Sequence, residues 1–178
     1  MIKLDFVSWA VCLGLILPLL VQSAPEIQFP FGRIQGFDKV ESKSQKPYFV
    51  YYGIPYAKPP VSDLRFRAPQ PYVGNGSDVV ISSSSFRPAC IQIEAYNGQV
   101  MSEDCLHLNI FRPADNSTVK KVLFYIHGGA FQVGQASMYL PTQIAADYDV
   151  IVVTMQYRLG VLGFLSSGSS ADGNNGLR

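Results

Sequence analysis

The sequence predicts an α/β fold in which an antiparallel N-terminal portion leads into a central, mostly parallel sheet. Residues 122–126 and 150–155 are short, nearly continuous apolar runs rich in valine and isoleucine, a pattern typical of strands buried on both faces. The connection between them is long enough for a crossover, and Pro141 begins a predicted helix that extends to Tyr148. Parallel neighbours require such a connection, so we expect the two strands to pair in parallel.

The region before these runs predicts shorter strands and extended segments. Residues 26–38 are broken by proline and glycine and predict edge strands or a hairpin. Aromatic residues concentrate at 48–52, and apolar and polar residues alternate at 106–111, so each stretch predicts a strand. Five prolines between residues 53 and 72 impose a largely extended path there. Serine, glycine and asparagine dominate residues 166–175, which we expect to form a loop.

Composition and charge exclude several functional classes. Hydrophobic residues make up 48% of the 178 residues and charged residues 15%, which is typical of a globular protein. The formal net charge of +1 gives no reason to expect nucleic acid or an acidic membrane surface as a partner. The sequence contains no cluster with metal-ligand spacing, and it implies no metal or organic cofactor.

Residues 1–23 are predicted to be a secretory signal peptide, which leaves residues 24–178 as the mature region. Lys3 precedes an uncharged apolar stretch at residues 6–21, and cleavage after Ser23 satisfies the preference for small residues at such sites. An uncleaved membrane anchor is the alternative. It is less favoured, because the stretch falls short of the ~20 apolar residues that span a bilayer.

Two further features agree with an extracellular location. Sequons for N-glycosylation occur at Asn75 and Asn116, both in polar, turn-like segments. Signal cleavage leaves two cysteines, Cys90 and Cys105, and an even pair in an oxidising compartment favours a disulfide over two buried free thiols. We therefore expect a secreted glycoprotein with no stable membrane span after cleavage.

The most informative motif is Tyr-Ile-His-Gly-Gly-Ala-Phe at residues 125–131, where the first apolar run ends. When an ester carbonyl becomes tetrahedral, its oxygen gains negative charge that preorganised backbone N–H groups stabilise. Glycines let the backbone turn sharply and approach a substrate closely, and the motif resembles the oxyanion loop of an α/β-hydrolase. The Gly-x-Ser-x-Gly motif that carries the nucleophile of lipases and esterases occurs nowhere in the 178 residues. The chain therefore contains one half of an ester-cleaving site.

Five ordered blocks extend the resemblance over almost all of the mature sequence. Together they resemble the N-terminal part of the type-B carboxylesterases, the cholinesterase-like family with the α/β-hydrolase fold. The blocks are G-I-P-Y-A with P-P, L-R-F with A-P, S-E-D-C-L-H-L-N, the H-G-G-A-F loop, and V-V-T through Y-R-L-G to G-F-L, within residues 53–60, 64–69, 102–109, 127–131 and 152–165. The resemblance implies a small-molecule carboxylic ester as substrate and an acyl-serine intermediate.

The resemblance also assigns structural roles. Cys90 and Cys105 match the family's first disulfide. Arg65 and Glu103 match two positions that form a buried ion pair, which we expect to specify the fold and not to take part in catalysis.

The catalytic role implied by the resemblance falls on the glycine-rich loop. Gly129 and Ala130 match the residues whose N–H groups point at the oxyanion, and Gly128 is expected to supply the flexible turn. Alanine at position 130 keeps the N–H group and adds a methyl group near the acyl side of the substrate.

The two histidines are not expected to be the catalytic base. His107 stands where tyrosine is usual in the family, and we expect it to be a surface or hydrogen-bonded residue. His127 is expected to order the oxyanion loop, and Gln156 stands where asparagine is usual. In the family the nucleophile elbow follows a segment that resembles residues 173–178, and the acid and histidine come later. The chain therefore lacks the Ser/acid/His triad.

These observations favour a secreted carboxylic-ester hydrolase to which this chain contributes the oxyanion-hole half, inactive by itself. The alternative from another class is a non-catalytic cholinesterase-like adhesion or binding domain, which would carry a replaced serine in the elbow. A third possibility is that the 178 residues are the complete product. It is disfavoured, because strand 150–155 would lack a neighbour on one side and leave an aggregation-prone apolar edge.

Overall fold

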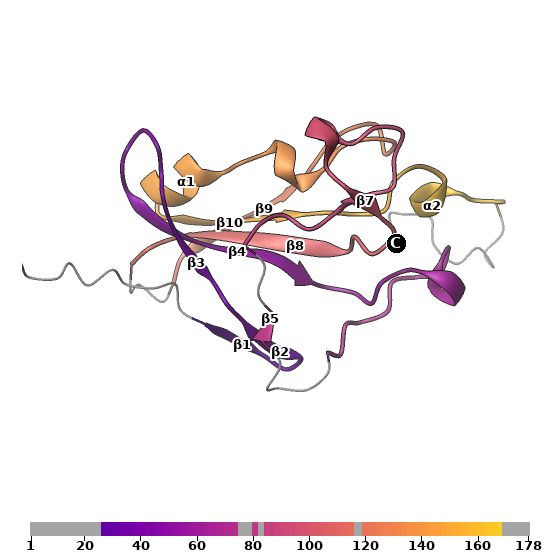
Figure 1. Ribbon diagram of the computed structural model, residues 1–178, viewed down its shortest axis with the longest axis horizontal. Helices are drawn as coiled ribbons and strands as arrows, with labels where there is room; N and C mark the ends of the chain where they lie inside the picture. The colour runs from indigo at the N-terminus through magenta and orange to yellow at the C-terminus, as the bar shows by residue number, and fades with distance from the viewer. Residues whose placement is uncertain (1–25, 75–79, 82–83, 116–118, 169–178) are drawn as a thin grey trace, which may run out of the picture.

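A five-stranded mixed sheet forms the centre of the part of the chain that the structure describes. The structure is a computed structural model, and it describes residues 26–74, 80–81, 84–115 and 119–168. The predicted signal peptide, both sequon asparagines and residues 173–178 lie outside these ranges. The strands of the sheet are, in spatial order, β3 (Phe37–Val40), β4 (Pro47–Pro55), β8 (His107–Pro113), β10 (Val150–Met155) and β9 (Lys121–Ile126) (Figure 1).

The pairing in this sheet confirms the predicted α/β class. β9 and β10 pair in parallel, with Lys121 opposite Val150 and Ile126 opposite Met155, and helix α1 (Thr142–Asp147) lies in the connection between them. The other three pairs, β3 with β4, β4 with β8 and β8 with β10, are antiparallel. The described strands of this five-stranded sheet therefore comprise the predicted antiparallel N-terminal portion and one parallel pair.

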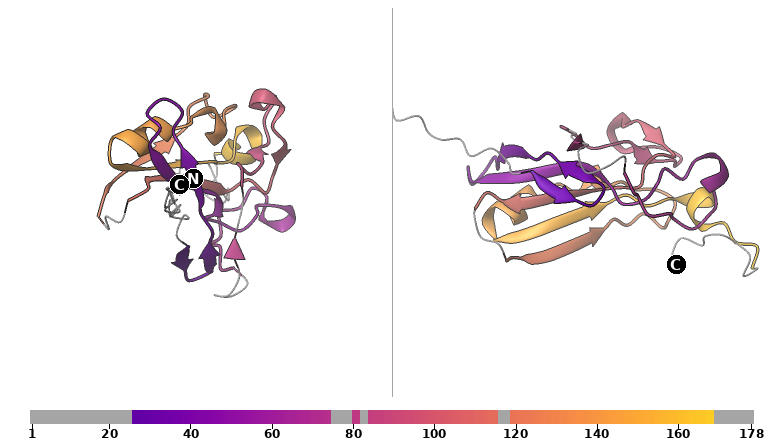
Figure 2. Two further views of the ribbon diagram at one scale, coloured as in Figure 1. Left: turned by 60° about the vertical axis from the view of Figure 1, so that its left-hand side comes forward. Right: turned by 90° about the horizontal axis from the view of Figure 1, so that it is seen from below.

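The edge of the sheet differs from the expectation. β10 lies between β8 and β9, so residues 150–155 have neighbours on both sides. β9 is the edge strand of the described sheet, and its Val122 and Phe124 are 61% and 50% exposed, although an apolar run predicts burial on both faces (Figure 2). The composition of a strand shows that both of its faces are apolar, but it does not show where the strand lies in the sheet.

Two layers cover the described sheet, one on each face (Figure 1). On one face Ala145 of α1 packs among Val50 and Phe111. On the other face the small sheet β1-β2-β5 contributes Ile34, which packs with Phe49. The strands of this small sheet are β1 (Ile27–Phe29), β2 (Gly32–Ile34) and β5 (Val80–Ile81).

A buried polar contact fixes the register where β4 is irregular. The β4–β8 pairing shifts between Tyr51 and Ile54, and Gly53 there has a φ of 67°. The side chain of Asn109 accepts a 3.0 Å hydrogen bond from the Gly53 N–H and donates one of 3.2 Å to the Thr154 hydroxyl. These bonds satisfy polar groups that would otherwise be buried without partners.

The remaining elements are short. They are β6 (Ala89–Cys90), β7 (Met101–Ser102), α2 (Gly160–Phe164) and the 3₁₀ turns η1 (Ser62–Leu64), η2 (Tyr96–Gly98) and η3 (Ala136–Met138). Within the described ranges, none of the helices has the length and apolar character needed to cross a bilayer.

Candidate oxyanion site

The loop that follows β9 adopts a strained, left-handed backbone at three successive residues. The φ angles of Gly129, Ala130 and Phe131 are 127°, 52° and 61°. A Cβ atom at Gly129 would collide with the carbonyl oxygen of Val133, so only glycine fits there. The left-handed region costs an L-residue ~1–2 kcal/mol, and strain of this kind gathers at functional sites.

Gly128 was expected to supply the flexible turn, but its backbone does not require glycine. Gly128 lies outside the left-handed region, and a Cβ atom built there meets no other atom within 4 Å. The sharp turn therefore depends on Gly129, which also accepts 3.0 Å hydrogen bonds from the N–H groups of Gln132 and Val133.

Two backbone donors of this loop are unused. Within the described ranges, the N–H groups of Gly129 and Ala130 donate no hydrogen bond. Both residues line a cavity of about 290 Å³, whose wall also includes Met155, Tyr157 and Phe164. Unpaired N–H groups beside a cavity are the donors that a developing oxyanion requires.

Three hydrogen bonds hold the loop in place. Nδ1 of His127 lies 2.9 Å from the carbonyl oxygen of Gly128, and the Tyr157 hydroxyl donates a 2.7 Å hydrogen bond to the His127 carbonyl. The N–H of Gly160 donates another of 2.7 Å to the carbonyl of Phe131. Because a carbonyl oxygen only accepts, Nδ1 carries the proton. His127 thus orders the loop, as expected.

Burial disfavours the protonated form of His127 in this position. Its side chain is buried, and desolvation lowers the pKa of the imidazole, outweighing the opposing effect of the hydrogen bond to Gly128. A neutral ring in a fixed tautomer is suited to positioning the backbone.

Glutamine side chains connect the loop to its surroundings. Gln92 binds the Gly134 backbone twice, accepting a 2.8 Å hydrogen bond from its N–H and donating one of 3.0 Å to its carbonyl. The buried Gln156 accepts a 3.1 Å hydrogen bond from the Ala136 N–H. Gln156 therefore has a structural role at the position where asparagine is usual.

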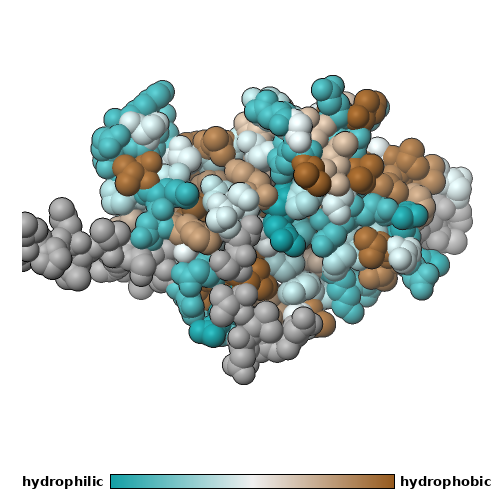
Figure 3. Space-filling view, viewed as in Figure 1, coloured by the Kyte–Doolittle hydropathy of each residue, from teal (hydrophilic) through white to brown (hydrophobic). Residues whose placement is uncertain are grey.

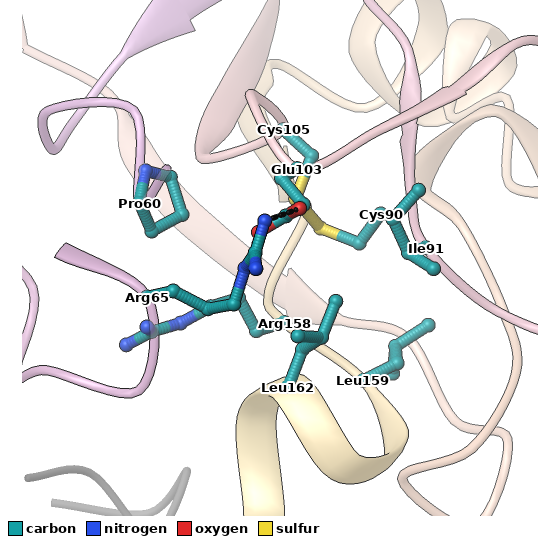
Figure 4. Close-up of a pocket in the computed structure, with 9 residues that line it drawn as sticks. All are labelled: Pro60, Arg65, Cys90, Ile91, Glu103, Cys105, Arg158, Leu159 and Leu162. Carbon is teal, nitrogen blue, oxygen red and sulfur yellow. Dashed lines mark hydrogen bonds and ion pairs between the residues drawn. A yellow bond between two sulfur atoms is a disulfide. The ribbon is translucent and has the colours of Figure 1, made fainter. Parts of the chain in front are cut away.

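The predicted disulfide and ion pair lie together beside α2 (Figure 4). Cys90 and Cys105 form a disulfide with an S–S distance of 2.05 Å. Arg65 binds Glu103 through Nε at 2.6 Å and Nη2 at 2.5 Å. The side chains of this pair are 45% and 23% exposed, so it is not the buried pair that was expected. These four residues line a space of about 10 Å³, which holds at most one water molecule.

His107 also differs from the expectation. It is buried, its Nδ1 has no hydrogen-bond partner among the described residues, and its Nε2 lies 3.8 Å from Asp104. Desolvation lowers the pKa of His107 and outweighs the opposing effect of Asp104. His107 does not line the cavities of about 850, 290 and 460 Å³ that include residues of the glycine-rich loop. The residue belongs to the core of the sheet.

Two aromatic residues that complete the cavity, Tyr157 and Phe164, were not predicted from the sequence as site residues. Tyr157 follows β10, and Phe164 ends α2. The predicted strand pairing could have identified them, because the carboxyl ends of neighbouring parallel strands meet at one edge of a sheet, where α/β proteins place their sites. The residues just after β10 therefore had to lie near those just after β9. No three His, Cys, Asp or Glu side chains in the described ranges gather closely enough to hold a metal ion.

Solved structures with the same arrangement are esterases of the α/β-hydrolase class. A thermophilic PNB esterase matches with a TM-score of 0.72 and 37% identity, over 85% of this chain and 32% of the esterase chain. A carboxylesterase of Geobacillus stearothermophilus matches with a TM-score of 0.68 and 38% identity, over 85% and 31%. The fold is thus that of an α/β-hydrolase, present in part.

The sequence comparisons agree and identify the family. The model of the carboxylesterase family matches residues 23–178. Carboxylesterase 3 of Pongo abelii is 39% identical over 191 residues, which cover 94% of this chain and 33% of the relative. Juvenile hormone esterase of Tribolium castaneum is 39% identical over 182 residues, which cover 98% and 30%. The chain belongs to the carboxylesterase family, and it spans about a third of the length of these relatives.

Proposed function

We propose that this chain is the oxyanion-hole half of a secreted serine esterase that hydrolyses small-molecule carboxylic esters. Gly129 and Ala130 donate their N–H groups to the oxygen of the tetrahedral intermediate, and Gly128 leads the backbone into the turn. The reaction proceeds through an acyl-serine intermediate, with the serine, its acid and its histidine supplied by sequence beyond Arg178.

The observation that carries the proposal is the pair of unused N–H groups at Gly129 and Ala130, beside a cavity of about 290 Å³. A donor held in place before the reaction costs no reorganisation when the oxyanion forms. The bonds from Tyr157 and Gly160 to the loop supply that rigidity. Loss of one such donor lowers kcat by about 10²–10³-fold in enzymes of this kind.

The absence of a nucleophile motif supports the proposal that the 178 residues alone are inactive. The sequence has no Gly-x-Ser-x-Gly motif and only two histidines. His127 is hydrogen-bonded to the loop and His107 is buried in the sheet, so neither is placed to activate a serine, which is a weak nucleophile without an adjacent base.

Secretion is supported by three independent features. The first 23 residues have the charge and apolar pattern of a cleavable signal peptide, and two sequons follow at Asn75 and Asn116. The disulfide between Cys90 and Cys105 is the kind of cross-link that persists in an oxidising compartment.

The proposal is tested by sequencing the transcript past the codon for Arg178 and expressing the encoded protein in a secretory host. We expect an open frame with an intact Gly-x-Ser-x-Gly elbow, release of the protein into the medium, hydrolysis of 4-nitrophenyl butyrate and labelling by a fluorophosphonate. Residues 24–178 alone should neither hydrolyse 4-nitrophenyl butyrate nor be labelled by the fluorophosphonate. A replaced elbow serine, with no labelling, would instead identify a non-catalytic binding domain.

A further inference from the structure

Residues 91–104 form a surface segment that the disulfide between Cys90 and Cys105 closes at its base. The segment contains η2 and β7, and it lies against the stretch that follows the glycine-rich loop (Figure 1). All of residues 91–104 belong to the part of the chain that the structure describes, and among them Ala95 alone is buried. Figure 3 shows hydrophilic and hydrophobic side chains mixed on the surface around β7. Apolar burial therefore contributes little to holding the segment in place, and its polar contacts decide where it lies.

Two glutamine side chains interlock this segment with the stretch after the glycine-rich loop. Gln92 of the segment pairs with the backbone of Gly134, accepting a 2.8 Å hydrogen bond from the N–H and donating one of 3.0 Å to the carbonyl. Gln135, which is buried, makes the converse contact: it accepts a 2.9 Å bond from the Tyr96 N–H and donates one of 3.3 Å to the Tyr96 carbonyl. Because each amide uses both its acceptor and a donor on one residue, the two contacts fix orientation as well as distance.

The Gly134 end of this contact packs against the turn of the candidate oxyanion site. The N–H of Gly134 and the carbonyl of Val133 belong to one planar peptide unit. Gln92 holds the N–H, and the carbonyl oxygen packs so closely that a Cβ atom at Gly129 would lie 1.7 Å from it. A Cβ atom at Gly134 would in turn lie 2.4 Å from the Gly128 carbonyl oxygen. The peptide unit that Gln92 orients is therefore in close contact with Gly128 and Gly129.

We propose that Gln92 is a positioning residue for the oxyanion hole. It fixes the peptide unit between residues 133 and 134, which sets the direction of the N–H groups at Gly129 and Ala130, and Gln135 locks the segment that carries Gln92. Neither glutamine lines the cavity of about 290 Å³ beside those N–H groups, so the effect passes through the backbone. This inference rests on the proposed function, because it takes Gly129 and Ala130 as the oxyanion donors.

Removal of the Gln92 amide should lower the rate of the chemical step. Gln92→Met keeps the length of the side chain and removes both hydrogen bonds to Gly134. In the full-length protein we expect kcat for 4-nitrophenyl butyrate to fall about 10–100-fold with little change in KM, because displaced donors weaken binding of the transition state and not of the substrate. Gln135→Met should act in the same direction. Because the two contacts belong to one network, the double variant should lose less than the product of the two single losses.

Gln35→Met is the matched control. Gln35 is also half-buried, and its amide donates a 3.1 Å hydrogen bond to the carbonyl of Gly36, directly after β2 and not to the backbone of residues 127–135. This variant should retain the wild-type kcat. An equal loss of kcat in Gln92→Met and Gln35→Met, or wild-type kcat in a Gln92→Met protein with native circular dichroism, overturns the positioning role while ester hydrolysis stands.

Hydrogen exchange measured by mass spectrometry separates this inference from the proposed function. In full-length Gln92→Met, backbone exchange over residues 127–135 should be about tenfold faster than in the wild type, while exchange in β4 and β8 stays unchanged. If the wild type hydrolyses no ester, the proposed function fails, and exchange alone decides. Faster exchange confined to residues 127–135 supports positioning by Gln92, whereas unchanged or uniformly faster exchange overturns it.

A second variant covers the case in which Gln92→Met does not fold. Gln92→Glu keeps the acceptor for the Gly134 N–H but places a second oxygen against the Gly134 carbonyl, where the amide donates its hydrogen bond. We expect the same loss of kcat and the same local rise in exchange. Wild-type values of both in Gln92→Glu overturn the inference.

Discussion

The hydroxyl of Tyr157 donates a 2.7 Å hydrogen bond to the carbonyl of His127, and the rings of the two residues stack with centroids 4.5 Å apart. Tyr157 follows β10 and His127 follows β9, so this contact ties together the ends of the parallel pair. His127 directly precedes the turn, and the contact therefore fixes the direction in which the glycine-rich loop leaves the sheet.

Replacement of Tyr157 by Phe should loosen the loop and leave the stacked ring in place. We expect a loss of about 1 kcal/mol in unfolding free energy and a lower kcat of the full-length enzyme with little change in KM, since the donors act mainly in the transition state. Tyr56→Phe is the control, because its hydroxyl donates a comparable 2.8 Å bond to the carbonyl of Gln156 and not to the backbone of residues 127–131. An equal loss of kcat in both variants would contradict this role for Tyr157.

Replacement of Gly129 by Ala should remove the oxyanion hole. The added Cβ collides with the Val133 carbonyl, so the turn must open, and we expect kcat to fall by at least about 10²-fold. Gly98→Ala is the control, since Gly98 also has a positive φ, of 65°, but a Cβ there meets nothing within 4 Å. That variant should lose stability but retain kcat. Full activity of Gly129→Ala would exclude this turn as the hole.

Stability should depend on pH through the two histidines. Burial lowers the folded-state pKa of both His107 and His127 below the ordinary value of about 6.5. Their contribution is therefore complete above that value and is lost as pH falls, because the unfolded chain then binds protons that the folded chain does not. Urea unfolding should show a falling free energy between pH 7.5 and 5.5, with a smaller slope in His107→Gln. Equal slopes would show that His107 does not contribute.

The disulfide should stabilise the protein through the loop that it closes. Cys90 and Cys105 are 15 residues apart, for which the chain-entropy model gives about 3 kcal/mol. We expect the Cys90→Ser/Cys105→Ser double variant to lose about that much in chemical unfolding. Mass spectrometry of the unreduced secreted protein should find the two cysteines in one cross-linked peptide pair. Free thiols at both positions would refute the assignment.

Local patterns predicted those parts of the fold that depend on neighbouring residues. The runs at 122–126 and 150–155 predicted β9 and β10, and their long connection predicted both α1 and the parallel pairing. The position of β9 at the edge was not predictable, because an apolar strand has the same composition wherever it lies in a sheet. The role of Asn109, which satisfies a bulge 56 residues earlier in the chain, depends on pairing that no local pattern encodes.

The candidate site also has one part that local sequence predicted and another that depends on tertiary contacts. The H-G-G-A-F motif predicted the loop, since its residue types follow from the chemistry of an oxyanion. The need for glycine at position 129 and not at 128 came only from the φ angles and the Val133 carbonyl. The burial of His107 and the exposure of the Arg65–Glu103 pair likewise depend on which segments cover them.

The most direct test of the central claim is a crystal structure of the full-length protein inhibited by an alkyl phosphonate, whose charged oxygen takes the place of the oxyanion. We predict a phosphonylated serine whose oxygen lies about 2.7–3.1 Å from the backbone nitrogens of Gly129 and Ala130. A phosphonyl oxygen bound by other groups, with both nitrogens out of hydrogen-bond range, would contradict the assignment of the oxyanion hole to this chain.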